Sequence, residues 1–372
     1  MNRAASQSAG SINSFLEWLD GNVQIHRICE ARSTFLYHAA FQFACLRTLP
    51  TLQRRIGFDL VHTDFPLMSD LLVQLLKRTK ARTISTVHTT IEGQNLGVRR
   101  AEKDLLRLEQ SDLANLMLVL PLKLCEYFYL RRVHHLITSS EYIKTELQEC
   151  FPFLRGRYLP VVRYGIDTDL FSRCTAWQRE DLREISSLDR PIVLFAGRLV
   201  ASKGIHTLIQ AIPKILHAHP SAVFLFAGGG DCRQYVRELR NRGVPRESYR
   251  FLGYVDYFDM PQVYSLASVF AVPTLYESLP LRILEAMSCE TPTVATRVCG
   301  IPEMISHEED GILIQPMDYE ELAKSIVLLL EDNGLARKLG RKARQTVTDR
   351  FCARDMASRT MDVFKRCLES EA

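Results

Sequence analysis

Short apolar runs alternate with amphipathic segments along most of the chain. The first half carries such runs at residues 59–62, 82–88 and 136–139, each followed by helical spacing of apolar positions. After Gly165 the alternation restarts, with runs at residues 191–197, 222–228, 249–252, 269–272 and 293–295. Runs of this kind are typical of buried parallel strands joined by helices. Two such series predict an α/β protein made of two doubly wound, Rossmann-like domains that face each other across a cleft.

The predicted domain boundary lies where the two series meet, near residues 163–172. We expect an N-terminal domain over residues 1–163 and a second domain over residues 164–350. The chain has 372 residues, more than one ordinary hydrophobic core serves. The sequence contains no apolar stretch of the ~20 residues that a membrane-spanning helix needs. Residues 1–14 lack the charged start and apolar run of a secretory signal, which predicts a cytoplasmic protein.

Charge is divided unevenly between the two halves. Before Gly165, 21 Lys and Arg residues stand against 15 acidic residues, a net charge of +6, and after it 26 stand against 28, a net charge of −2. Cations that carry much of the excess are Lys77, Arg78, Lys80, Arg82, Arg99, Arg100 and Lys103. Such a half can approach anionic lipid headgroups at a membrane or a phosphorylated acceptor, and a solvated basic face explains the charge equally well. No nucleic-acid-binding motif accompanies the charge.

The ten cysteines show no close pair with the spacing of a zinc or redox site. In a reducing cytosol we expect them to be free thiols, most of them buried. The overall apolar fraction of 47% and charged fraction of 24% are typical of a globular protein.

The turns that follow the strands of the second half are the places to look for chemistry, because open parallel sheets bind ligands there. The first turn carries Arg198 and Lys203 between two glycines, directly before a helix. A helix N-terminus with two cations is suited to a diphosphate, although a pair of surface cations is the simpler alternative. The second turn, residues 228–230, is three glycines, which permit a close approach of a ligand. An ordinary tight turn explains them as well.

A third turn carries two carboxylates eight positions apart. Glu277 falls in the turn, Pro280 suits the first turn of the following helix, and Glu285 lies further along that helix. Carboxylates at one helix mouth can accept hydrogen bonds from sugar and ribose hydroxyls. A single Glu near a helix start is more often a surface residue that complements the helix dipole, so the whole string is far more specific than either acid.

Six segments in the same order resemble the retaining glycosyltransferases of family 4, which have the GT-B fold. They read FAGRLVASKGIHTLIQAI, FLFAGGGD, FLGYV, VPTLYESLPLRILEAM, GIPEMI and DGILI, and they run from about residue 192 to residue 314. A weaker match extends back to about residue 59. The spacing between Glu277 and Glu285 is the most specific element. Residues 351–372 resemble the C-terminal helix that crosses back to the N-terminal, acceptor-side domain.

The resemblance implies a role for individual positions. It assigns to the donor Gly197, Arg198, Lys203, Gly229, Val255, Glu277, Ser278, Leu279, Pro280, Leu281 and Glu285. Arg198 and Lys203 would neutralise the diphosphate, and Glu285 would hold the ribose hydroxyls. Glu277 would contact and orient the donor sugar, and His88 of the first domain would face it. Arg198, Lys203, Glu277 and His88 are the predicted catalytic residues.

The resemblance also implies a reaction without a cofactor or metal. The substrates would be a nucleotide-sugar, of UDP or GDP type, and a carbohydrate or lipid-linked acceptor, in the synthesis of cell-surface polysaccharide, lipopolysaccharide or glycolipid. The cations and helix ends would stabilise the negative charge that develops on the leaving diphosphate. Asp167 and Asp169 have the spacing of a metal site, but the family uses this segment as a turn, so we expect no metal there.

The sequence departs from the family pattern at several positions. Glu290 and Cys299 stand where the family often has glycine, and Arg163-Tyr164 replaces the usual Pro-Asn pair. Residues 22–27 resemble a later strand of the N-terminal domain, so we expect the opening β-α-β unit of that domain to be absent or unrecognisable. Three interpretations follow: a shortened product, a unit supplied by a partner chain that covers the N-terminal domain, or a protein without transferase activity. The alternative function is therefore a nucleotide-sugar-binding subunit or scaffold without turnover.

Overall fold

The computed structural model describes residues 34–64, 71–76, 79–101, 119–187 and 189–369. The chain divides into two compact units. Met1–Phe58 and Met68–Lys80 form the first, and Asp59–Leu67 and Ala81–Ala372 form the second. The segment 22–27, which we interpreted as a strand, lies outside the described residues. The predicted domain boundaries at residues 163 and 350 stay predictions.

The first unit contains helices α2 (Thr34–Ile56) and α3 (Leu71–Leu75). The side-chain oxygen of Gln42 on α2 accepts a hydrogen bond of 3.2 Å from the backbone N–H of Leu72 on α3. Near the end of α2, the side-chain oxygen Oε1 of Gln53 accepts hydrogen bonds from the Thr79 hydroxyl and the Lys80 N–H at 2.8 and 3.1 Å. These contacts join α2 to α3 and to the residues that follow α3.

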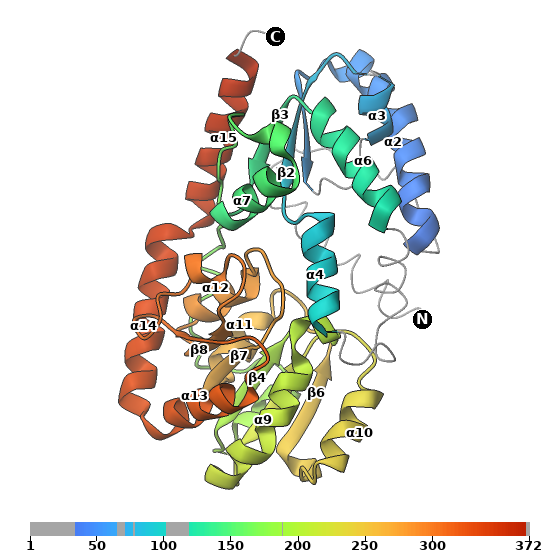
Figure 1. Cartoon of the computed structure of the whole chain (residues 1–372). Coiled ribbons are helices and arrows are strands. Elements are labelled where there is room, and N and C mark those ends of the chain that lie inside the picture. Colours follow the sequence, from blue (N-terminus) through green and yellow to red (C-terminus); the bar gives the residue numbers. More distant parts are fainter. Residues whose placement is uncertain (1–33, 65–70, 77–78, 102–118, 188, 370–372) are drawn as a thin grey trace. The chain divides into compact units, whose positions relative to one another are not determined.

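The second unit begins with a parallel sheet of three strands in the order β1-β2-β3. The strands are β1 (Leu60–Asp64), β2 (Arg82–Val87) and β3 (His135–Thr138), and each adjacent pair is parallel. Helices α4 (Ile91–Ala101), α6 (Val119–Arg132) and α7 (Glu141–Cys150) belong to this part of the chain, and the short 3₁₀ helix η2 (Pro152–Leu154) follows α7. The C-terminal helix α15 (Ala353–Glu369) lies beside this sheet (Figure 1). Its Val363 and Cys367 pack against Ile84 of β2 and Ile137 of β3.

The second sheet has six parallel strands in the order β6-β5-β4-β7-β8-β9. They are β4 (Ile192–Ala196), β5 (Val223–Ala227), β6 (Tyr249–Gly253), β7 (Val269–Val272), β8 (Thr293–Thr296) and β9 (Ile312–Ile314). From β4 the chain adds β5 and then β6 on one side, and from β7 it adds β8 and then β9 on the other side. The strand order therefore reverses between β4 and β7, and a crevice at the carboxyl ends of these strands is where such sheets bind ligands.

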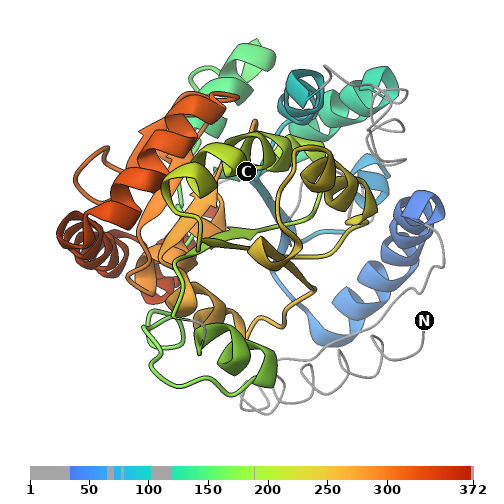
Figure 2. The same cartoon turned by 90° about the horizontal axis from the view of Figure 1, so that it is seen from below.

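Alternate residues of β4 serve two separate cores. Val193 and Phe195 face one core, with apolar residues of α9 (Ile205–Ala218), α10 (Arg233–Asn241) and α13 (Tyr319–Glu331). Ile192 and Leu194 face the other, with α8 (Glu180–Ser186), α11 (Met260–Leu266), α12 (Leu281–Ser288) and α14 (Asn333–Arg350). Helices therefore cover both faces of the sheet (Figure 1 and Figure 2). Three further 3₁₀ helices are η3 (Ala201–Lys203), η4 (Arg246–Ser248) and η5 (Ile301–Glu303).

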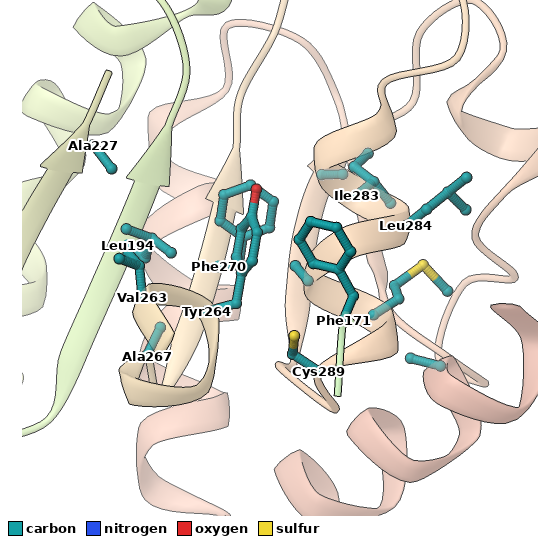
Figure 3. Close-up of a cluster of buried hydrophobic side chains, with 14 of the residues drawn as sticks. Phe171, Leu194, Ala227, Val263, Tyr264, Ala267, Phe270, Ile283, Leu284 and Cys289 are labelled. Atoms are coloured by element: carbon teal, nitrogen blue, oxygen red, sulfur yellow. The ribbon is translucent and has the colours of Figure 1, made fainter. Parts of the chain in front are cut away.

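The second of these cores is rich in aromatic rings. Phe171 and Tyr264 are fully buried, with ring centroids 6.4 Å apart, and Tyr264 meets Phe270 of β7 edge to face at 5.5 Å. Figure 3 shows Phe171 beside the helix that carries Ile283 and Leu284. Buried apolar area of this kind stabilises a domain by roughly 25 cal/mol for each Å² removed from water. Packing against this core therefore fixes the position of helix α12, which carries Glu285.

The alternation of apolar runs predicted these parallel sheets, and the structure confirms the α/β fold class. Each run in the second half forms a strand within one or two residues of its expected bounds. We did not predict β9 as a strand, although its residues belong to one of the matched segments. A three-residue run carries no periodicity of its own, which is why pattern alone missed it.

The two positions where glycine was expected keep the left-handed backbone. Glu290 has φ 60° and Cys299 has φ 50°. Glu290 follows the C-cap of α12, and the N–H of Thr291 bonds back to the carbonyl of Ala286 at 3.0 Å, the pattern of a Schellman motif. The turn geometry is therefore retained without glycine, at a conformational cost of about 1 kcal/mol for each residue.

Candidate active site

A cavity of about 470 Å³ lies beside the ends of β4 and β7. Most of its lining residues come from β4, β7 and the turns and helix that follow strands of the six-stranded sheet, and His88, directly after β2, and Tyr164 complete the wall. They are His88, Tyr164, Phe195, Ala196, Lys203, Ala271, Val272, Thr274, Glu277, Ser278, Leu279, Pro280, Leu281, Arg282 and Glu285. The predicted site residues His88, Lys203, Glu277, Glu285 and 278–281 are among them. The cavity thus lies at the point where the strand order of the larger sheet reverses.

Lys203 and Glu277 form a salt bridge within this cavity. Lys203 ends η3, and Gly204 follows it with φ 70°. A Cβ at Gly204 would lie 1.7 Å from the carbonyl oxygen of Pro273, so only glycine allows the two turns to approach this closely. The N–H of Leu275 also donates to the carbonyl of Ser202 at 2.9 Å. This backbone contact brings together a cation and a carboxylate that are far apart in the sequence.

Glu285 is buried on α12, with 8% of its surface exposed. The hydroxyl of Tyr264 donates a hydrogen bond of 2.7 Å to one carboxylate oxygen. Burial raises the pKa of Glu285, and the bond from Tyr264 and the nearby Arg282 charge partly oppose that shift. A carboxylate held in this way has one oxygen engaged and is anchored to the aromatic core below it.

The imidazole of His88 lies beside the ring of Tyr164. The hydroxyl of Tyr164 is hydrogen-bonded to Nδ1 of His88, and the ring centroids are 5.4 Å apart. Tyr164 stands at one of the positions where the sequence departs from the family, and we did not predict it as a site residue. The bond fixes the orientation of the imidazole in the cavity wall.

Tyr276 occupies a notch that two glycines form on α4. A Cβ at Gly93 would lie 1.8 Å from the Tyr276 hydroxyl oxygen, and one at Gly97 would lie 2.7 Å from its Cβ. The hydroxyl donates to the carboxylate of Glu146 at 3.2 Å and lies 3.1 Å from the hydroxyl of Thr89. The residue directly before Glu277 is therefore held by the part of the chain that surrounds the three-stranded sheet.

A second link joins the same parts of the chain. The carboxylate of Glu303, on η5, accepts a hydrogen bond of 2.9 Å from the N–H of Tyr142 and one of 3.2 Å from the N–H of Glu141, in the first turn of α7. Arg163 donates to the same carboxylate through Nε and Nη2 at 3.2 and 3.1 Å. Both residues of the Arg163-Tyr164 departure thus have a structural partner.

Four predicted donor residues do not line the cavity: Gly197, Arg198, Gly229 and Val255. Arg198 is exposed in the turn after β4, while Val255 is buried among the apolar residues on the α12 side of the sheet. Gly228 approaches Gly197 so closely that a Cβ on it would lie 1.8 Å from the Gly197 carbonyl oxygen. These glycines let the turns after β4 and β5 pack on each other.

Several residues of the cavity wall were not among the predicted site residues: Tyr164, Phe195, Thr274 and Arg282. Arg282 could have been found, because it lies inside the matched string and is a cation in the first turn of a helix that follows a strand. Phe195 belongs to β4, whose continuous apolar run predicted only a buried strand. Nothing in the local pattern marks Tyr164, because its partner His88 is 76 positions away.

The basic residues of the first half are partly used inside the protein. Arg100 donates a hydrogen bond of 3.2 Å to the carbonyl of Leu275, next to Tyr276, and Arg82 donates to the carbonyl of Cys367 on α15. Lys77, Arg78 and Lys103 lie outside the described residues.

In the parts of the chain that the structure describes, no helix combines the length and apolar content that crossing a bilayer requires.

The described residues contain no cluster of three His, Cys, Asp or Glu side chains arranged to hold a metal ion. The carboxylate of Asp167 accepts hydrogen bonds from the N–H groups of Asp169 and Leu170 at 2.9 and 3.0 Å. It therefore organises the turn that follows Gly165.

Solved structures establish the class of fold. HepE of Anabaena, in a crystal structure in complex with UDP-glucose, is similar over 96% of this chain and 89% of its own, with a TM-score of 0.71 and 17% identity. The order of parallel strands, the helices on both faces and this likeness define the GT-B fold.

Family models and curated relatives establish the family. Residues 178–346 match the glycosyl transferases group 1, and residues 13–170 match glycosyltransferase family 4. The chain therefore belongs to the family 4, or group 1, glycosyltransferases. An uncharacterized glycosyltransferase of Methanocaldococcus jannaschii is 31% identical over 66% of this chain and 63% of its own length. The GDP-mannose-dependent α-(1-6)-phosphatidylinositol monomannoside mannosyltransferase of Mycobacterium tuberculosis is 28% identical over 61% of this chain and 60% of its own.

Proposed function

We propose that this protein is a retaining glycosyltransferase that moves a sugar from a nucleotide-sugar donor to a carbohydrate or lipid-linked acceptor. The observation that carries the proposal is the convergence of His88, the Lys203–Glu277 ion pair and the buried Glu285 on one cavity of about 470 Å³. Charged groups of both signs around a cavity of this size fit a ligand with anionic phosphates and many hydroxyls.

The donor would lie with its ribose at Glu285 and its sugar at Glu277. Carboxylates accept hydrogen bonds from hydroxyl groups, and Glu285 has one oxygen held by Tyr264, which leaves its second oxygen to accept a further bond. The diphosphate between the two sugars would meet Lys203, and the exposed Arg198 would approach it from the turn after β4. His88, held by Tyr164, would face the reacting sugar.

The reaction exchanges one bond of the anomeric carbon for another. The bond from this carbon to the donor phosphate oxygen breaks, and its electron pair leaves with the nucleoside diphosphate. The acceptor hydroxyl oxygen bonds to the carbon on the same face, and its proton passes to the leaving phosphate oxygen. Cations and helix ends stabilise the charge on that phosphate without a metal ion. The sugar carries oxocarbenium character in between, as in glycoside hydrolysis.

The donor base and the acceptor are open parts of the proposal. The relatives differ in their donors, since the HepE structure contains UDP-glucose and the mycobacterial relative is described as GDP-mannose-dependent. We propose synthesis of a cell-surface polysaccharide, lipopolysaccharide or glycolipid on the cytoplasmic side of a membrane. The basic residues of the first half support contact with an anionic surface or acceptor.

A donor assay with a matched variant tests the proposal. Purified protein is incubated with UDP-, GDP- and ADP-sugars, release of the nucleoside diphosphate is measured, and NMR of any product identifies the anomeric configuration. We expect release with one class of donor, retention of configuration, activity in the presence of EDTA, and loss of turnover in Glu277→Ala. Tight donor binding without release would favour the alternative function of a nucleotide-sugar-binding subunit. No binding of any donor would refute both.

A further inference from the structure

We propose that Arg282 binds the donor phosphate next to the ribose, while Lys203 binds the phosphate next to the transferred sugar. The inference rests on the proposed function and divides the diphosphate between two cations. It adds a phosphate ligand, Arg282, in the first turn of α12.

Arg282 and Lys203 differ in what neutralises them. Both line the cavity, and both are half-buried. Lys203 is paired with Glu277, whereas Arg282 makes no hydrogen bond or salt bridge to any other residue that the structure describes. The Arg282 charge acts on the buried carboxylate of Glu285 without a salt bridge to it. The N–H groups of the guanidinium can therefore donate to an anionic ligand in the cavity.

The position of Arg282 selects the phosphate that it would meet. Arg282 precedes Glu285 by three positions on α12, so the two side chains lie on the same side of the helix. A Cβ added at Gly197 would lie 3.2 Å from Nη1 of Arg282, so the guanidinium reaches over the end of β4. The charge of Arg282 acts on Glu285, whereas Lys203 is paired with Glu277. If Glu285 holds the ribose, Arg282 is the cation next to it.

The chemistry of the guanidinium suits this position. Its planar fork can donate two parallel hydrogen bonds to one phosphate, which a lysine ammonium cannot do. The first-turn N–H groups of α12 and the positive end of its dipole lie at the same wall, where residues 278–282 line the cavity. Arg282 and the helix end would therefore act on the same phosphate.

Binding of a nucleoside, its monophosphate and its diphosphate separates the two cations. The base is first chosen by the thermal shift that UDP, GDP and ADP each produce in the wild-type protein, because a ligand of the folded state raises its stability. Calorimetry then compares wild type, Arg282→Gln, Arg282→Lys and Lys203→Gln. Arg341→Gln, an exposed arginine on α14, serves as the matched control.

We expect Arg282→Gln to weaken both the monophosphate and the diphosphate by about ten-fold to a hundred-fold, with no change for the nucleoside. Arg282→Lys should recover part of that loss. Lys203→Gln should weaken the diphosphate and leave the monophosphate unchanged. Monophosphate affinity equal to wild type in Arg282→Gln would overturn the inference while the proposed function stands. A wild-type protein that binds none of the three diphosphates would overturn the proposed function itself.

Discussion

The six-stranded sheet and the three-stranded sheet contribute to the same cavity in different ways. The larger sheet supplies Lys203, Glu277 and Glu285 from turns and a helix that directly follow its strands. The smaller sheet supplies His88 and, through α4, the notch that holds Tyr276. Charged groups near strand ends belong to short sequence motifs and can therefore be recognised from the sequence. The notch and the bond between His88 and Tyr164 are tertiary contacts, which motifs do not record.

Substitution of Glu277 should produce the largest effect, because it removes the contribution of the larger sheet to the reacting sugar. We expect Glu277→Ala to lower kcat by about 1,000-fold, as the loss of a group that acts on the transition state does. Nucleotide affinity should change only a few-fold. The measurement is turnover together with calorimetric binding of the nucleoside diphosphate. Equal loss of binding and turnover would show that this acid is structural.

A methyl group at Gly93 should break the link between the two regions. In Gly93→Ala the new Cβ would lie 1.8 Å from the Tyr276 hydroxyl oxygen, so Tyr276 must move and displace its neighbour Glu277. We expect kcat to fall by about ten-fold to a hundred-fold and the free energy of unfolding to fall by about 1–3 kcal/mol.

The double variant Gly93→Ala/Tyr276→Ala controls for the clash. Removal of the tyrosine ring leaves only the Glu146 carboxylate, at 2.7 Å, close to the new methyl group. The double variant should therefore be less destabilised than the sum of the single changes. Denaturant unfolding of all three variants measures this coupling. Additive losses would mean that Tyr276 and α4 do not act as one contact.

The free energy of unfolding should also depend on pH, through Glu126 on α6 in the part of the chain around the smaller sheet. The pKa of Glu126 is raised to about 8, mainly by burial and also by the charges of Glu146 and Glu92, while the N–H of Ile91 and the Lys123 charge oppose the shift. An unfolded chain releases this proton near the ordinary value of 4.5, before the folded protein does. The free energy of unfolding therefore falls as pH rises between these values, by at most about 1.4 kcal/mol per pH unit.

Glu126→Gln should remove that slope. Its side-chain oxygen can still accept the hydrogen bond from Ile91, which the carboxylate now accepts at 3.3 Å. Urea midpoints measured from about pH 5 to pH 8 should fall less steeply in the variant than in wild type, and the variant should be the more stable protein at the upper end. Parallel curves would show that Glu126 does not titrate in this range.

The smallest effect is expected at the turn after α12, where the larger sheet departs from the family. Glu290→Gly places the residue best suited to φ 60° at that position and should raise the free energy of unfolding by about 1 kcal/mol or less. The ion pair that it removes, to Arg173 at 3.9 Å, contributes little because the arginine is exposed. A lowered melting temperature would mean that Glu290 contributes more than its backbone conformation costs.

The apolar pattern and the family resemblance together predicted most strands of the larger sheet but fewer residues of the cavity wall. The apolar runs predicted β4, β5, β7 and β8 because each is buried on both faces, and buried parallel strands are continuous runs of apolar residues. The edge strand β6 is mostly half-buried, and its run was also predicted. The same strings directed attention to Glu277 and Glu285, and their roles toward a donor stay predictions. Arg282 was passed over because the family pattern names the acids of that string and not the cation between them.

Other features could not have been predicted because they depend on residues that meet only after folding. Tyr164 is held by its hydrogen bond to the His88 imidazole, and Tyr276 packs into the space that two glycines leave on α4. Gly93 and Gly97 look like poor helix formers in the sequence, since glycine lowers helix stability by up to about 1 kcal/mol. Their value is the space that they leave for a ring from another part of the chain.

The most direct test of the account is a crystal structure of the protein with the nucleotide-sugar that binds it most tightly. We expect the donor in the cavity beside β4 and β7, with its ribose hydroxyls within hydrogen-bonding distance of Glu285, its diphosphate at Lys203 and Arg282, and its sugar at Glu277. A donor bound at any other place, or one whose diphosphate touches neither cation, would contradict the account.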